Sequence, residues 1–237
     1  MQNIHPTVEI GVGVQIEGNV TIGEGCKIGA YSIITGDTII GKNNVFSPHT
    51  IIGGDPQDHK FKGGGKLTVG NDNIFREFTT LHRGHLTETG TIIKDNNHFF
   101  TSTHVGHDCI VGNNNTFVNQ TGLAGHVTLG NNNNVSGNVC VHQFCNIGDH
   151  CMISALSGIR QDIPSYAMVL GDPAKIIGIN QIGLKRAGWN SDEINLLKEG
   201  YRLFRANLSG DNKYLCILNE FKKQSQRGLI SFSRRRR

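Results

Sequence analysis

The sequence predicts a mainly β protein, a left-handed parallel β-helix of hexapeptide repeats with a small C-terminal α-helical domain. An aliphatic or aromatic residue recurs every six positions, many of these residues precede a glycine, and asparagine runs follow several of the glycines. A period of six fits neither an α-helix nor a simple strand. It is the period of hexapeptide solenoids, in which six residues form one short strand and one turn.

The repeat runs through most of the first two thirds of the chain. Nine consecutive hits run from Ile4 to Ile52, three more end at Leu81, and twelve run from Ile93 to Ile159. Three hexads make one triangular coil of about 18 residues, so side chains that far apart should stack into aliphatic columns. Asparagine suits the corners because it tolerates left-handed backbone and bonds its own main chain.

Two stretches, residues 53–68 and 82–92, break the period and are predicted to loop out of the coils. Long excursions from a rigid scaffold commonly carry function. We assign residues 1–175 to the β-helix, 176–230 to the helical domain and 231–237 to a basic tail.

The helical domain is expected to contain two helices. Ser191 followed by two acidic residues predicts a helix start, because acids favour a helix N-terminus. Apolar residues then fall on one helical face, and Gly210 is expected to end this helix. Residues 214–223 predict a second helix.

Charge and cysteine content narrow the function classes. The net charge of +4 is supplied by the four arginines at 234–237, so a broad nucleic-acid-binding face is not expected. Six cysteines without a C-x-x-C pair, and no signal segment, predict a reduced, cytoplasmic protein. The apolar runs are too short to cross a bilayer, so no integral membrane association is expected.

Histidines gather in the middle coils, at His104, His107, His126 and His142. Steps of 18 residues lead from His107 to Gly125 and Gln143, so these three should stack on one edge of the prism. The other histidines lie close to that column. The convergence predicts a functional site at this edge.

His107 is the predicted general base, since a histidine titrates near neutrality and can activate a hydroxyl. Neighbours on a straight strand point to opposite faces, so Asp108 can orient His107 only if the pair turns a corner. The N–H of Gly125 is predicted to bind the oxyanion formed when a thioester is attacked. Cys109 is expected to be a core or inter-coil residue rather than a nucleophile.

Six strings carry a resemblance to a known family: residues 57–60 (QDHK), 81–84 (LHRG), 103–109 (THVGHDC), 123–127 (LAGHV), 141–145 (VHQFC) and 183–186 (GLKR). They closely resemble the acyl carrier protein–UDP-N-acetylglucosamine O-acyltransferases, which begin lipid A biosynthesis. The resemblance runs from the N-terminal repeats to about residue 190, and the helical region matches more loosely.

The resemblance implies transfer of a 3-hydroxyacyl chain from acyl carrier protein to the 3-hydroxyl of UDP-N-acetylglucosamine by a homotrimer whose sites lie between subunits. It implies the same roles for His107, Asp108 and Gly125, and no metal or cofactor besides the phosphopantetheine of the donor. Substrate contacts are implied for Gln57, Asp58, Lys60, His104, His126, His142, Gln143, Asn180 and Arg186. Lys185, Arg186 and Arg202 are expected to contact the acidic carrier protein.

Two positions depart from the family pattern. Ile182 stands where the family usually has a glutamate, which removes a polar contact at the nucleotide end. Ala155 aligns with the position that measures acyl-chain length, and its methyl group would favour a somewhat shorter chain. Acyl length and an oxygen or nitrogen acceptor therefore stay open.

Three alternatives remain. A sibling N-acyltransferase acting on an amino-sugar nucleotide is compatible with Ile182. A γ-type carbonic anhydrase also has this fold and holds zinc with three histidines, but Gln143 offers an amide where a ligand would be needed. A catalytically silent scaffold would have no use for the His107–Asp108 pair.

Overall fold

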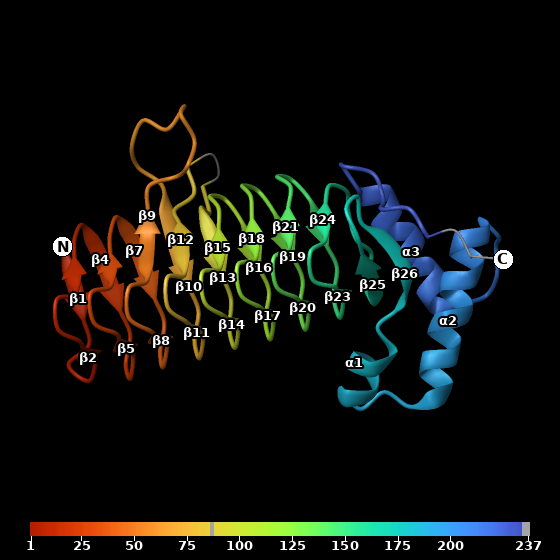
Figure 1. The fold of residues 1–237 in the computed structure, drawn as a ribbon, viewed down its shortest axis with the longest axis horizontal. Coiled ribbons are helices and arrows are strands. Elements are labelled where there is room, and N and C mark those ends of the chain that lie inside the picture. Colours follow the sequence, from red (N-terminus) through yellow and green to blue (C-terminus); the bar gives the residue numbers. More distant parts are fainter. Residues whose placement is uncertain (86–87, 234–237) are drawn as a thin grey trace.

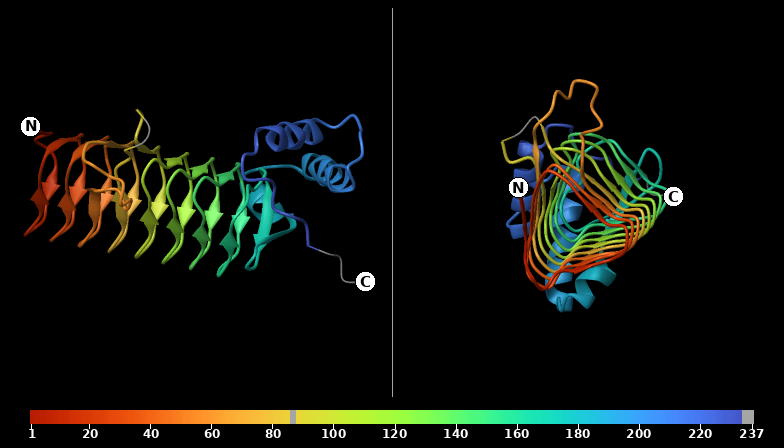
Figure 2. Two further views of the ribbon diagram at one scale, coloured as in Figure 1. Left: turned by 90° about the horizontal axis from the view of Figure 1, so that it is seen from above. Right: turned by 90° about the vertical axis from the view of Figure 1, so that its left-hand side faces the viewer.

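A computed structural model describes residues 1–85 and 88–233. Within the predicted basic tail at 231–237, residues 231–233 bond to the main chain of Ile176, and residues 234–237 lie outside the described residues. The chain winds into a triangular prism with three sheets as its faces (Figures 1 and 2). The repeat prediction is confirmed, because successive hexads supply successive faces. We name the faces A, B and C in chain order, and each edge by the two faces that it joins.

Each face is a ladder of short strands, all parallel except at the last pairing of face B. Face A contains β1 (Gln2–Ile4), β4 (Asn19–Ile22), β7 (Asp37–Ile40), β10 (Lys66–Val69), β13 (Thr91–Ile93), β16 (Ile110–Val111), β19 (Thr128–Leu129) and β22 (Asn146–Ile147). Face B contains β2 (Glu9–Ile10), β5 (Lys27–Ile28), β8 (Val45–Phe46), β11 (Ile74–Phe75), β14 (His98–Phe99), β17 (Thr116–Phe117), β20 (Asn134–Val135), β23 (Met152–Ile153), β25 (Ala167–Leu170) and β26 (Lys175–Ile179). Face C contains β3 (Gln15–Ile16), β6 (Ile33–Ile34), β9 (Ile51–Gly54), β12 (Thr80–His82), β15 (His104–Val105), β18 (Gly122–Leu123), β21 (Cys140–Val141) and β24 (Gly158–Ile159).

The core is the predicted set of stacked columns. In the middle coils the partners are 18 residues apart, as in Val105 with Leu123. Every hexad residue from Ile22 to Ile159 is buried, whereas Ile10 in the first coil is half exposed. On face B, four phenylalanine rings stack through consecutive coils, with centroids less than 5 Å apart.

The edges turn through left-handed backbone three residues after the hexad aliphatic. At the A–B edge this position is often asparagine, as in Asn114 with φ of 58°. Only one asparagine of each run takes this conformation, such as Asn43, Asn114 or Asn132. Asn115, next to Asn114, is buried, and its side chain donates to Asn97 and to the carbonyl of Gly130. Asparagine is therefore structural at this edge, as predicted.

Both predicted excursions leave the prism at the C–A edge, where they stand up from the coils in Figure 1. The first lies between β9 and β10 and the second between β12 and β13. Strand pairing resumes at Lys66 and Thr91. Both excursions therefore end before residues 68 and 92, where the break in the repeat predicted their ends.

The C-terminal part folds against the last coils. Strand β26 runs across the predicted boundary between residues 175 and 176 and pairs antiparallel with β25, so it belongs to face B. The helices are α1 (Gln181–Arg186), α2 (Ser191–Ala206) and α3 (Lys213–Gln224). The sequence did not predict α1. Helix α2 begins at the predicted Ser191 but is capped by Asn190, and it ends at left-handed Asn207 rather than at Gly210. No helix within the described residues is long and apolar enough to cross a membrane.

Candidate active site

Two columns of residues line the C–A edge beside the excursions. His107, Gly125 and Gln143 occupy the position two residues after the hexad aliphatic, as the 18-residue step predicted. The next position, at Asp108, His126 and Phe144, is left-handed, with φ of 57°, 61° and 64°. The chain therefore turns a corner between His107 and Asp108, which meets the geometric condition for their side chains to touch.

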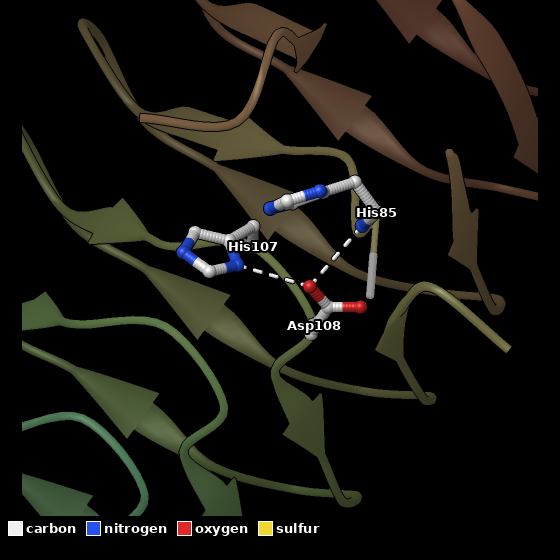
Figure 3. Close-up of side chains that lie close together, drawn as sticks. All are labelled: His85, His107 and Asp108. Carbon is white, nitrogen blue, oxygen red and sulfur yellow. Dashed lines mark hydrogen bonds and ion pairs between the residues drawn. The ribbon is translucent and has the colours of Figure 1, made fainter. Parts of the chain in front are cut away.

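Asp108 holds the His107 ring in one orientation (Figure 3). Its Oδ2 lies 2.9 Å from Nδ1 of His107 and accepts the main-chain N–H of His85 at 3.1 Å. The main-chain N–H of His85 can only donate, so Oδ2 of Asp108 is an acceptor. Nδ1 of His107, which contacts the same oxygen, therefore donates to it and carries the proton. In the neutral ring the other nitrogen, Nε2, is then the one without a hydrogen, so it is the atom that can accept a proton.

Gly125 lies directly beneath the His107 ring. A Cβ atom at this position would stand 2.6 Å from Nε2 of His107, so only glycine leaves room for the ring. Among the described residues the N–H of Gly125 donates to no acceptor, whereas the equivalent N–H of Asn113 at the A–B edge donates to Asn131. A free main-chain N–H beside the base is the arrangement that an oxyanion requires.

The first excursion is fastened over this edge by polar contacts with the second. Asp55 pairs with Arg83 and its carbonyl meets His82, while Asp58 pairs with Nε2 of His85 at 3.2 Å. The main-chain N–H of Lys60, together with His85, holds the pKa of the Asp58 carboxyl below its usual range. Asp58 therefore presents a carboxylate near the base.

The remaining predicted residues of this edge differ in burial. His104 is partly buried and contacts Thr80 and the His82 ring, and His126 stacks on Phe144. Burial lowers the pKa of His82, His104 and His126. Four predicted substrate contacts are exposed at or beside the edge: Gln57, Lys60, His142 and Gln143.

Asn180 and Arg186 lie elsewhere, on the opposite side of the prism from the excursions, where α1 is drawn in Figure 1. Both line a cavity of about 570 Å³ on face B, together with Met152, Met168 and Ile182. Asn180 also caps α1, accepting from Gly183 and donating to the carbonyl of His150. Ala155 is exposed beside Leu156 at the B–C edge, so a single chain does not bring these residues to His107.

His85 and Arg83 are site residues that the sequence analysis did not select. They lie in the second excursion, outside the period that placed the other histidines in columns. His85, His107 and Asp108 bring ligand-type atoms within 4.8 Å of one another, but Asp108 engages both neighbours through hydrogen bonds. The break in the period at 82–92 and the string at 81–84 both pointed to this excursion, but neither singled out His85.

Cys109 is a core residue, as the sequence favoured. Its side chain is fully buried, and its thiol donates to the carbonyl of Ala124. Burial raises the pKa of this thiol to about 12. A thiol that stays protonated and faces the core cannot serve as a nucleophile at neutral pH.

The depressed pKa of His104 predicts a stability change with pH. Burial and the nearby His82 and His107 rings lower it to about 4, whereas an unfolded histidine titrates near 6.5. The unfolded chain therefore binds the additional proton first, and stability falls as pH drops through this window. Chemical denaturation at pH 7.5 and at pH 5 measures how far the free energy of unfolding falls between the two pH values. We expect this fall to be about 2 kcal/mol smaller in His104→Gln than in the wild type. An equal fall in the free energy of unfolding in both proteins would contradict the lowered pKa of His104.

Comparison with known proteins places these features in a family. A family model described as UDP N-acetylglucosamine O-acyltransferase, domain 2, matches residues 162–236, and a bacterial transferase hexapeptide model matches residues 3–36 and 19–54. The chain is 44% identical over 209 residues to the O-acyltransferase of Bartonella bacilliformis, covering 82% of this chain and 76% of the relative. It is 41% identical to that of Xanthomonas oryzae, covering 97% and 94%.

Solved structures of similar proteins point to the same family. The UDP-N-acetylglucosamine acyltransferase of Francisella novicida superposes with a TM-score of 0.91 at 33% identity, over 97% of this chain and 90% of that one. The Bacteroides fragilis enzyme gives 0.84 at 32% identity, over 97% and 98%. These neighbours confirm the predicted left-handed β-helix and favour none of the alternative functions. The chain belongs to the UDP-N-acetylglucosamine O-acyltransferase family.

Proposed function

We propose that this protein transfers a 3-hydroxyacyl chain from the thioester of an acyl carrier protein to the 3-hydroxyl of UDP-N-acetylglucosamine, the first step of lipid A biosynthesis. The relatives are named for transfer from acyl carrier protein to this sugar nucleotide. The observation that carries the proposal is the oriented His107 ring above the free N–H of Gly125.

These residues account for each proton and bond of the reaction. Nε2 of His107 takes the proton of the sugar 3-hydroxyl as the oxygen attacks the thioester carbon. The N–H of Gly125 stabilises the negative oxygen of the tetrahedral intermediate. When the C–S bond breaks, the departing thiolate takes the proton from His107, which returns the base to its starting state. Asp108 stabilises the charged imidazole between the two transfers.

The proposal includes a homotrimer, because one chain holds only part of the predicted site. The base lies at the C–A edge, whereas Asn180 and Arg186 line the cavity on face B and the acyl-length position Ala155 lies at the B–C edge. A cyclic arrangement of identical chains presents the C–A edge of one copy to the far side of the next. The nucleotide would then be held by Asn180 and Arg186 of an adjacent subunit.

The excursion and the histidines supply the other proposed substrate contacts. Asp58 offers a carboxylate to sugar hydroxyls, Lys60 a cation to phosphate, and the exposed Gln57 an amide. The proposed contacts of the later coils are His104, His126, His142 and Gln143.

Docking of the acidic carrier protein is assigned to the basic residues near α1 and α2. Arg186 and Lys185 stand on the rim of the face B cavity. Arg202 is committed to Glu199 through two hydrogen bonds of 2.8 and 2.6 Å, so it contributes less free positive charge than the sequence suggested. The compartment that we propose is the cytoplasm, where the six free cysteines would stay reduced.

A transfer assay tests the function directly. Purified protein is incubated with 3-hydroxyacyl carrier proteins of several chain lengths and UDP-N-acetylglucosamine, and the product is analysed by mass spectrometry. We expect a 3-O-acyl ester, with a somewhat shorter preferred chain than in an Ala155→Gly variant. No product with this sugar, but an amide with a 3-amino analogue, would overturn the proposal.

A further inference from the structure

His85 occupies the junction between the two excursions and the base. Its ring centroid lies 5.3 Å from that of His107 and 5.4 Å from that of Phe61, which it meets edge-on. Nε2 of the ring lies 3.2 Å from Oδ2 of Asp58. The side chain is only 8% exposed, so these contacts enclose it.

The chemistry of Asp58 fixes the direction of this hydrogen bond. The pKa of Asp58 lies below its usual range, chiefly because the main-chain N–H of Lys60 donates to the carboxyl, so the group is an ionised acceptor at neutral pH. Nε2 of His85 must therefore carry the proton. A charge-assisted hydrogen bond of this kind holds a carboxylate in one orientation more firmly than a neutral bond does.

The main chain and the side chain of His85 perform separable tasks. Its main-chain N–H donates to Oδ2 of Asp108 and so supports the catalytic pair. Its side chain donates to Asp58 in the first excursion. A substitution of the side chain leaves the main-chain donor in place, so the two tasks can be tested apart.

We propose that the His85 side chain is a positioning residue that orients Asp58 to bind the hydroxyls of the sugar nucleotide. The role rests on the proposed function and adds a residue that neither the repeat pattern nor the family strings assigned. His85 ties the first excursion to the edge that carries the base. The sugar thereby meets a carboxylate already fixed relative to Nε2 of His107, which lowers the cost of ordering the excursion on binding.

The test compares His85→Phe with Asp58→Ala, the double variant and the wild type. Phenylalanine keeps a ring against Phe61 and His107 but has no donor for Asp58. We expect the KM for UDP-N-acetylglucosamine and its Kd by calorimetry to rise about tenfold, the effect of one hydrogen bond to a charged group. The kcat should stay within about threefold of the wild-type value, because the main-chain contact to Asp108 survives. The double variant should bind no more weakly than Asp58→Ala alone.

Two controls complete the design. His85→Gln keeps an N–H donor and should recover most of the affinity, whereas His5→Phe, at an exposed position in the first coil, should match the wild type. Unchanged Kd and KM in His85→Phe, additive losses in the double variant, or a loss confined to kcat would each overturn the role. A wild type that binds no UDP-N-acetylglucosamine would instead refute the proposed function. Melting temperatures check that every variant is folded.

Discussion

The His107→Ala variant is expected to transfer acyl chains about a thousandfold more slowly than the wild type, with KM for both substrates little changed. A positioned general base contributes about a hundred- to ten-thousandfold to such a reaction. In the proposed reaction the ring also returns the proton to the leaving thiolate, so its loss is expected to affect both halves of the reaction. Initial rates at saturating donor and acceptor measure the effect.

The control for His107 is a histidine with no part in the site. His5→Ala removes an exposed imidazole from the first coil and should leave kcat unchanged. If kcat of the folded His107→Ala variant fell only a few-fold, another group would have to take the hydroxyl proton. A large rise in KM with unchanged kcat would assign His107 to binding instead.

The Gly125→Ala variant is expected to lose about a hundredfold or more in kcat. The new methyl group would stand 2.6 Å from Nε2 of His107, so the ring must move away from the position it needs. The same methyl narrows the approach of the thioester oxygen to the free N–H, and removal of one oxyanion donor typically costs about a hundred- to a thousandfold. The φ of Gly125 lies outside the left-handed range, so alanine introduces no backbone strain.

A matched glycine separates the catalytic effect from a general one. Gly178 in β26 also has a φ outside the left-handed range, and a Cβ there would meet no atom within 4 Å. Gly178→Ala should therefore retain activity and melting temperature. Wild-type rates in Gly125→Ala would show that neither the ring position nor the N–H at this edge matters for transfer.

The repeat determined how much of the fold could be predicted. Because one hexad makes one strand and one turn, steps of 18 residues predict that His107 stacks on Gly125. The 18-residue step predicts no positions where the six-residue period stops. The ends of the excursions, helix α1 and the caps at Asn190 and Asn207 depend on contacts that no periodic pattern records.

The site residues on the coils were predicted from the 18-residue step. On the excursions the family resemblance supplied Gln57, Asp58 and Lys60, but not Arg83 or His85. His85 is absent from every column, since its place beside His107 follows from the path of a loop rather than from a period. Asn180 was predicted from the family string, yet the structure also uses it to cap α1. The resemblance implied a site between subunits, but it did not say which residues lie on which side of the prism. That division follows from the path of the chain through β26 into α1, which the repeat does not predict.

Subunit complementation tests the shared site most directly. His107→Ala lacks the proposed base at the C–A edge, and Arg186→Ala lacks the proposed nucleotide contact at face B, so each variant alone should be inactive or nearly so. When the two are expressed together and assemble at random, about one quarter of the interfaces pair an intact His107 with an intact Arg186. Recovery of about one quarter of the wild-type rate is the predicted result. No recovery in mixed trimers, shown to contain both chains, would contradict a site assembled between subunits.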